Sequence, residues 1–375
     1  MKLCNIYPNA PHYRRAIFLK MDEAFDCAWM FGERPLGGKD IVSMRPDEFR
    51  CFLGFLKNVR IFGNWYWQRG VLSLLGADFD TYLILGEPYC VSSWLFCALA
   101  KLRPGKRVFF WSHGWYGREN FVKRILKKIF FRLADGVFLY GNYARELMIC
   151  NGFSAGKLWT IHNSLDYAEQ RRLRERLEPS EILKKHFGDA GAGAVGTLIF
   201  VGRLTAVKRL DMIAEAMVRL ARERGKKFDL VLVGDGAERC ALEEKFRALG
   251  LEGNVWFYGA CYDDAVLSEL IFNADLCVAP GNIGLTAMHA LAFGCPCLTH
   301  DDFKNQMPEF EAIVPGKTGA FFERGNVTAL ADAIEAWFAS ARDREAVRRA
   351  CYAEIEASWT ADWQLGVFRR VLSGA

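Results

Sequence analysis

Two basic residues beside a predicted strand are the first candidates for chemistry. The stretch VGRLTAVKRL places Arg203 directly after the strand and Lys208 near the start of the next helix. Both cations can face a crevice at the strand's C-terminal edge, where they would neutralise charge developing on a phosphate leaving group. Taken alone, the pair could equally be solvated loop charges.

A second stretch, APGNIGLTAMHALAFGCP, puts the loop Pro280 to Gly284 between a buried strand and a helix that begins near Leu285. Glycines at a helix N-terminus let backbone N–H groups and the positive end of the helix dipole approach a phosphate closely. The two stretches together predict a clamp for a diphosphate.

The elements that position these loops alternate between apolar strands and amphipathic helices. In the second half, strands are expected at 197–202, 229–234, 255–259, 275–280 and 296–300, with helices at 208–224, 238–249, 264–273 and 285–293. In the first half, strands are expected in LCNIYP and at 81–86, 108–114, 136–141 and 158–163, with helices at 13–25, 91–102 and 118–133. Such alternation specifies doubly wound parallel sheets, and ligands bind where strand C-termini meet helix N-termini.

The domain division follows from length and composition. A chain of 375 residues exceeds what one core usually organises, and the charged segment 166–186 is followed by GDAGAGAVG. We therefore expect a domain over 1–165, a linker region over 166–195, a second domain over 196–355 and a terminal helix over 356–375. This last helix should pack back toward the first domain.

Composition restricts the location and the metal chemistry. The apolar stretch near 91–100 is too short to cross a bilayer, and the N-terminus has no apolar core of signal-peptide length, so a cytoplasmic protein is expected. Asp78 and Asp80 are interpreted as a solvated turn, and Cys295 and Cys297 lack a second ligand pair. No metal site is predicted.

An ordered series of motifs resembles the family 4 retaining glycosyltransferases and their GT-B relatives. The series is GRLTAVKRLD, VLVGDGAERCALE, NADLCVAPGNIGLTAMHALAFGCPCLT and EAIVPGKTGAFFE, and the first half is similar only in outline through WSHGWYGRE and HNSLD. The resemblance implies the α/β GT-B fold, in which two Rossmann-like doubly wound domains face each other across a cleft. The N-terminal domain would bind the acceptor and the C-terminal domain the nucleotide-sugar donor.

The resemblance also implies residue roles. Arg203 and Lys208 would act in catalysis by holding the donor diphosphate, together with His113, which follows a strand where relatives have a histidine near the reacting sugar. The implied donor-binding set is Gly202, Gly281, Asn282, Ile283, Gly284, Leu285, Thr286, His289 and Glu311. A buried structural histidine is the alternative for His113, and a surface carboxylate is the alternative for Glu311.

The sequence departs from the family at two positions. Relatives usually carry two glutamates, one touching the donor sugar and one the ribose, and Gly281 and His289 stand in their places. We expect His289 to keep the ribose-facing role with weaker affinity. If it titrates near its reference pKa of about 6.5, donor binding would change between roughly pH 5.5 and 7.5. The alternative is a histidine packed on the inner face of its helix.

The expected activity is that of a retaining, metal-independent hexosyltransferase. It would use no cofactor beyond its nucleotide-diphosphate sugar and would act on a glycan or a lipid-linked oligosaccharide, in the biosynthesis of surface polysaccharides or glycoconjugates. Two alternatives remain open. One is a non-catalytic GT-B subunit that binds a nucleotide sugar or glycan, and the other is a nucleotide-sugar epimerase.

The basic residues are concentrated in one region. Between 101 and 132 there are ten Lys or Arg residues and one acid, Glu119. In the helix expected over 118–133, apolar residues form one face and basic residues the other, which is typical of helices that lie on anionic membranes. We expect peripheral attachment to the inner face of the membrane and no nucleic-acid partner. The alternative is that the apolar face packs on its own sheet.

Overall fold

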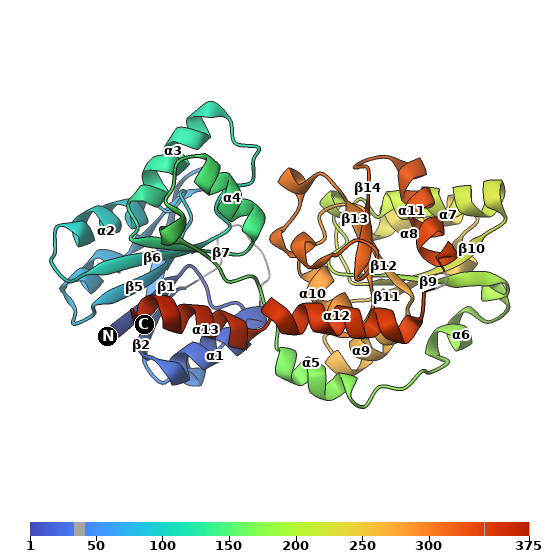
Figure 1. Ribbon diagram of the computed structural model, residues 1–375, viewed down its shortest axis with the longest axis horizontal. Coiled ribbons are helices and arrows are strands. Elements are labelled where there is room, and N and C mark those ends of the chain that lie inside the picture. The colour runs from blue at the N-terminus through green and yellow to red at the C-terminus, as the bar shows by residue number, and fades with distance from the viewer. Residues whose placement is uncertain (34–41, 341, 375) are drawn as a thin grey trace. The chain divides into compact units, whose positions relative to one another are not determined.

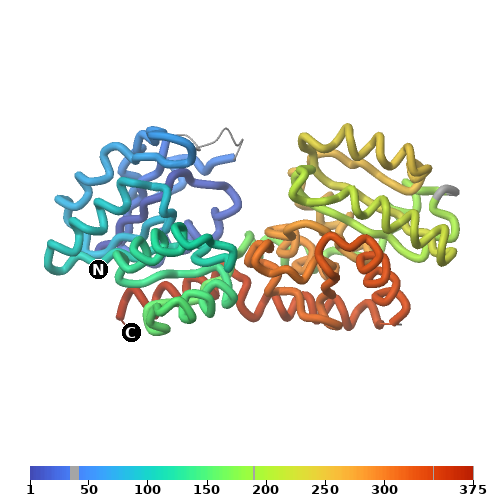
Figure 2. The backbone as a smooth tube through the Cα atoms, turned by 90° about the horizontal axis from the view of Figure 1, so that it is seen from above, coloured from blue at the N-terminus to red at the C-terminus, as the bar shows by residue number. Residues whose placement is uncertain are grey.

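The computed structural model describes residues 1–33, 42–340 and 342–374. The chain divides into two compact units, Met1–Asp166 with Thr360–Ala375, and Tyr167–Trp359. Both chain ends lie in the first unit, because the terminal helix α13 (Ala361–Leu372) belongs to it (Figure 2). Of the linker region expected over 166–195, the helices α5 (Tyr167–Arg174) and α6 (Ile182–Phe187) lie in the second unit.

The first unit is built on an eight-stranded sheet in the order β4-β3-β2-β1-β5-β6-β7-β8. Its strands are β1 (Lys2–Tyr7), β2 (Asp26–Gly32), β3 (Phe52–Phe62), β4 (Trp65–Arg69), β5 (Thr81–Leu85), β6 (Arg107–Ser112), β7 (Gly136–Leu139) and β8 (Leu158–Thr160). Neighbouring strands pair in parallel, except that β3 and β4 form an antiparallel hairpin at one edge. The strands from 26 to 69 were not predicted.

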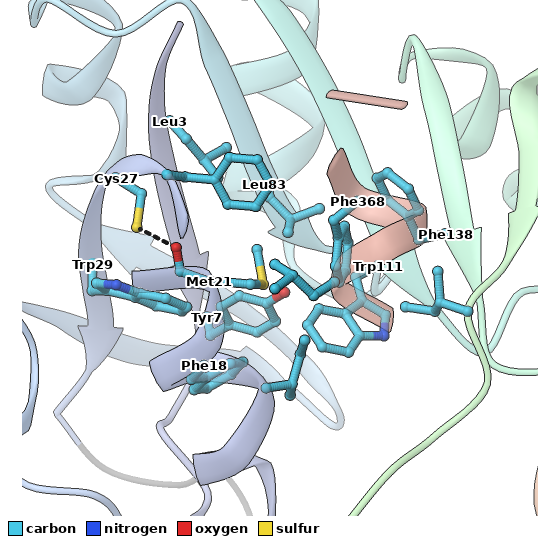
Figure 3. Packing of buried hydrophobic residues seen from close by; sticks show 14 of the residues in the cluster. Leu3, Tyr7, Phe18, Met21, Cys27, Trp29, Leu83, Trp111, Phe138 and Phe368 are labelled. Carbon is cyan, nitrogen blue, oxygen red and sulfur yellow. Dashed lines mark hydrogen bonds between the residues drawn. The ribbon is translucent and has the colours of Figure 1, made fainter. Parts of the chain in front are cut away.

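Helices cover both faces of this sheet (Figure 1). The helices α2 (Val91–Lys101), α3 (Phe121–Arg132) and α4 (Asn142–Cys150) lie on one face, and α1 (Arg15–Ala24) and α13 lie on the other. The core beneath α1 and α13 is rich in aromatic side chains, among them Tyr7, Phe18, Trp29 and Trp111 (Figure 3). Gln364 of α13 donates to the carbonyl of His162 at 2.7 Å, which fixes the terminal helix to this unit.

The second unit contains a six-stranded, fully parallel sheet in the order β11-β10-β9-β12-β13-β14. Its strands are β9 (Ala194–Val201), β10 (Lys227–Val233), β11 (Val255–Gly259), β12 (Leu276–Ala279), β13 (Cys297–His300) and β14 (Gly319–Phe322). The helices are α7 (Asp211–Arg224), α8 (Arg239–Ala248) and α11 (Val327–Ala339) on one face, and α9 (Asp264–Asn273), α10 (Leu285–Ala292) and α12 (Arg344–Ser358) with α5 on the other (Figure 1). The central strands β10, β12 and β13 are almost fully buried apolar runs, as expected for a sheet covered on both faces, whereas the edge strand β11 is partly exposed.

Candidate functional site

The predicted diphosphate clamp lies where the strand order of the second sheet reverses. The first strand of this sheet, β9, has β10 on one side and β12 on the other. Because the strands are parallel, the loops that follow β9 and β12 leave the same edge of the sheet. The first loop carries Gly202 and Arg203, and the second carries Gly281 to Gly284. Ligands of open α/β sheets bind at such a switch point.

Backbone contact between the two loops explains the glycine at 281. Its N–H donates to the carbonyl of Lys208 at 2.8 Å. A Cβ atom at this position would lie 1.9 Å from the carbonyl oxygen of Val207. In this loop conformation no side chain fits at 281.

Lys208 is the cation that the clamp holds in place. Its ammonium donates to the carbonyl of Asn282 at 2.6 Å and to the Oδ1 atom of the same residue at 2.9 Å. Burial lowers the pKa of Lys208 to about 8, against an opposing effect of Glu309 and with a smaller lowering by Arg203. Arg203 itself is exposed at the rim of the loop.

The N-terminus of α10 adjoins this ammonium. Gly284 precedes the helix with a φ of 57°, and no side chain caps the first turn. A Cβ atom on Gly284 would lie 3.9 Å from Nζ of Lys208. The positive end of a helix dipole and a lysine therefore meet at one point, an arrangement that favours an oxyanion.

Two groups of the predicted donor-binding set form hydrogen bonds to other parts of the chain. The N–H of Ile283 donates to Oε1 of the buried Gln306 at 3.0 Å, and Thr286 Oγ1 donates to the carbonyl of Val201 at 2.6 Å. Gln306 also donates to Thr299 Oγ1 at 2.8 Å. These bonds hold the loop after β12 against β9 and β13. No sequence pattern indicated Gln306, because it lies in a stretch without regular periodicity.

A buried acid lies on the 3₁₀ turn Pro308–Ala312. Glu309 is 1% exposed, and its charge raises the pKa of Lys208 against the effect of burial. Glu311, the acid selected from the sequence, is only half-buried on the same turn. Only one residue separates the two acids in PEFEA. Their burial, and not the sequence, shows that Glu309 is the acid that raises the pKa of Lys208.

His289 lies one turn into α10, and its Nδ1 atom is buried without a hydrogen-bond partner. Burial lowers its pKa to about 4. A pKa of about 4 lies below the expected titration range of pH 5.5 to 7.5, because burial disfavours the charged imidazole.

His113 lies in the first unit, two residues after Trp111, near the C-terminal end of β6. Its ring is 4.6 Å from that of Tyr140, and its Nδ1 atom is buried without a partner. Burial and the charges of Arg14 and Lys127 lower its pKa to about 4. His113 is therefore a neutral group at the carboxyl edge of the first sheet. It belongs to the first unit, whereas the residues of the clamp belong to the second.

Comparison with known proteins finds sequence similarity in the second unit. Residues 192–353, within the second unit, match the family of group 1 glycosyl transferases. N-acetyl-alpha-D-glucosaminyl L-malate synthase of Bacillus anthracis is 32% identical over 153 residues, which are 40% of this chain and 37% of that protein. Alpha-D-kanosaminyltransferase of Streptomyces kanamyceticus is 29% identical over 37% of this chain and 35% of its own. The matched region thus spans little more than a third of these relatives.

Solved structures extend the likeness to the whole chain. The lipopolysaccharide outer core galactosyltransferase WaaB matches with a TM-score of 0.71 and 16% identity, and Anabaena HepE in complex with UDP with 0.73 and 16%, each over 100% of both chains. The fold is GT-B. The predicted fold class is confirmed, and the clamp described above lies in the GT-B unit that carries the group 1 match.

The described part of this GT-B chain contains no group of three or more His, Cys, Asp or Glu residues that could hold a metal ion. Asp78 pairs with Lys2, and Asp80 accepts from the N–H of Lys2 at 2.9 Å, so both stabilise the start of β1. Within the same residues, no helix is long and apolar enough to span a bilayer.

Proposed function

We propose that this protein is a glycosyltransferase that takes its sugar from a nucleoside diphosphate donor bound by the second unit. The observation that carries the proposal is the meeting of the Lys208 ammonium with the uncapped N-terminus of α10 at the switch point of the sheet. The group 1 match over 192–353 and the UDP bound to Anabaena HepE support a uridine or related nucleotide.

The proposed mechanism transfers a hexose with retention and without a metal ion. Lys208, Arg203 and the α10 dipole would stabilise the departing diphosphate. An oxygen of that diphosphate would take the proton of the acceptor hydroxyl on the same face of the sugar. His113 would then serve as a neutral hydrogen-bonding group and not as a base, since its pKa of about 4 leaves it unprotonated but weakly basic.

The acceptor is proposed to be a glycan or a lipid-linked oligosaccharide in the synthesis of a surface polysaccharide or glycoconjugate, inside the cell. The structurally similar WaaB is, by its name, a lipopolysaccharide outer core galactosyltransferase. A lipid-linked acceptor would require the first unit to work at a membrane surface.

Helix α3 supplies such a surface. Phe130 and Phe131 pack into the core, whereas Phe121 and Val122 are 74% and 70% exposed and Ile125 and Ile129 are also exposed. The apolar stripe predicted from the sequence is therefore mostly turned outward, beside the cations Lys123, Arg124, Lys128 and Arg132. Lys127 is excluded from this surface, because it pairs with Glu119. We propose that this stripe inserts among anionic lipid headgroups.

A donor-hydrolysis and transfer assay tests the activity. The full chain is incubated with UDP- and GDP-sugars, and release of nucleoside diphosphate is followed with and without a glycan acceptor, with product anomers assigned by NMR. Release of diphosphate with retention of configuration supports the proposal. Binding without any turnover would instead favour a non-catalytic GT-B subunit, and isomerisation of the donor without transfer would favour an epimerase.

A further inference from the structure

Arg14 is a buried cation without an acidic partner. It is 8% exposed, and no carboxylate among the described residues forms an ion pair with it; its side-chain contacts are to Tyr140 and to aromatic rings. One guanidinium nitrogen donates to the hydroxyl of Tyr140, while its Nε atom is buried with no acceptor. A buried charge normally needs an opposite charge and hydrogen bonds. The hydrogen-bonding capacity of the Arg14 guanidinium is therefore only partly used.

Aromatic rings surround the guanidinium. Its carbon lies 4.7 Å from the ring centre of Trp111, 5.3 Å from that of Tyr140 and 5.8 Å from that of Tyr7. Tyr7 ends β1, Trp111 is near the end of β6 and Tyr140 directly follows β7. All three therefore lie at the carboxyl edge of the first sheet, where ligands of such sheets bind. Cation–π contacts stabilise the charge but leave its N–H donors free for oxygen.

The neighbouring polar atoms also lack partners. The hydroxyl of Tyr7, Nε1 of Trp111 and Nδ1 of His113 are buried and unbonded, as is the side-chain amide of Asn5, two residues before Tyr7 on the same strand face. Figure 3 shows the Tyr7 hydroxyl directed toward Trp111. Arg and Trp side chains can only donate, so Nε of Arg14 and Nε1 of Trp111 require acceptor oxygens.

We propose that Arg14, with Tyr7 and Trp111, binds an anionic group of the acceptor, either a carboxylate or a phosphate ester. This inference rests on the proposed function, because it assigns the substrate of the first unit. The partly exposed His113 contacts the ring of Tyr140, and the exposed Tyr13 lies with its ring centre 6.0 Å from the guanidinium carbon. A planar guanidinium fork recognises both oxyanions through paired hydrogen bonds.

Matched neutral and charged glycosides test the inference on the full chain. Methyl glucoside, methyl glucuronide and methyl glucoside 6-phosphate are compared by saturation-transfer NMR and by thermal shift, because a ligand that binds the folded protein raises the protein's melting temperature. We expect one charged sugar to bind at least about tenfold more tightly than the glucoside, and the two charged probes distinguish carboxylate from phosphate. Arg14→Met should abolish this preference, and Arg14→Lys should weaken it.

Arg107→Met is the control, since Arg107 also lies over an aromatic ring but begins β6 at the opposite edge of the sheet. It should leave the preference intact. The inference is overturned if wild type shows no preference for either charged sugar, or if folded Arg14→Met retains it. Should Arg14→Met not fold, the wild-type comparison and Arg14→Lys give the same decision. Titration of UDP into the wild type and each variant shows whether the donor site is intact. A failure of the acceptor proposal can then be distinguished from a failure of the donor site.

Discussion

The two units build the carboxyl edges of their sheets in different ways. In the second unit, the edge consists of backbone loops in contact, one lysine and a helix N-terminus, and the loop amide of Ile283 is satisfied by Gln306. In the first unit, the edge consists of aromatic rings around Arg14, and several buried donors have no partner. A site made of backbone groups and a single charge suits the diphosphate, which many nucleotide-sugar donors share. A site made of side chains with unpartnered hydrogen-bonding atoms suits one particular acceptor. Under the proposed function, the first unit would therefore determine acceptor specificity.

The largest expected effect concerns the second unit. Arg203→Ala and Lys208→Ala each remove a charge from the leaving-group clamp, and each should lower turnover by about 10²- to 10³-fold while the fold is retained. The control Lys245→Ala removes a lysine that pairs with Glu215 on α7, outside the clamp. Wild-type rates in both clamp variants would mean that the second unit does not stabilise the leaving group.

The backbone contact at 281 gives a stability test of the same edge. Gly281→Ala should destabilise the protein by about 2–4 kcal/mol, because its Cβ atom would meet the carbonyl oxygen of Val207. Gly366→Ala is the matched control in α13 of the first unit, where the added Cβ atom meets nothing within 4 Å. It should be neutral or stabilising by up to about 1 kcal/mol. Equal denaturant midpoints for the two variants would refute the close loop contact.

Exposed apolar residues of the first unit allow a test of membrane attachment. Phe121→Ser with Ile125→Ser should reduce flotation with phosphatidylglycerol vesicles by about tenfold, since each removes apolar surface that would enter the lipid. The control pair Val59→Ser with Ile61→Ser removes exposed apolar residues from the β3 edge of the same unit. Binding should also decrease with salt. Equal binding to neutral phosphatidylcholine vesicles would contradict the role of the α3 cations.

A smaller effect should appear as acid sensitivity in both units. The pKa values of His113 and His289 are lowered to about 4, against 6.5 for a free histidine. The unfolded chain takes up protons below about pH 6.5 while the folded histidines stay neutral, so stability is full above that pH and is lost as pH falls toward 4. We expect a loss of about 1–2 kcal/mol per histidine, measured by urea unfolding from pH 7 to 4.5. His289→Gln should reduce the slope, and an unchanged slope in this variant would show that His289 is not buried as a neutral group.

The sequence predicted the two units unequally. In the second unit the strands are apolar runs and most are followed by a helix, so periodicity located β9 to β13 and α7 to α10 within a few residues. In the first unit the hairpin of β3 and β4 was missed, because Phe55, Ile61 and Phe62 are exposed and the strands lack the pattern of a buried sheet. Lys208 and the 280–284 loop could be selected from type and spacing. Arg14, Gln306 and Glu309 could not, because their importance comes from burial and from contacts distant in sequence.

Calorimetric titration of UDP and GDP into the wild-type chain and Lys208→Met tests the diphosphate site of the second unit. We expect at least one nucleotide to bind wild type and Lys208→Met to weaken its affinity by about 100-fold, because the variant removes the ammonium that Asn282 holds beside the α10 N-terminus. Arg14→Met should bind the same nucleotide as tightly as wild type. Equal affinities for wild type and Lys208→Met, or no binding of either nucleotide to wild type, would contradict a diphosphate site in the second unit.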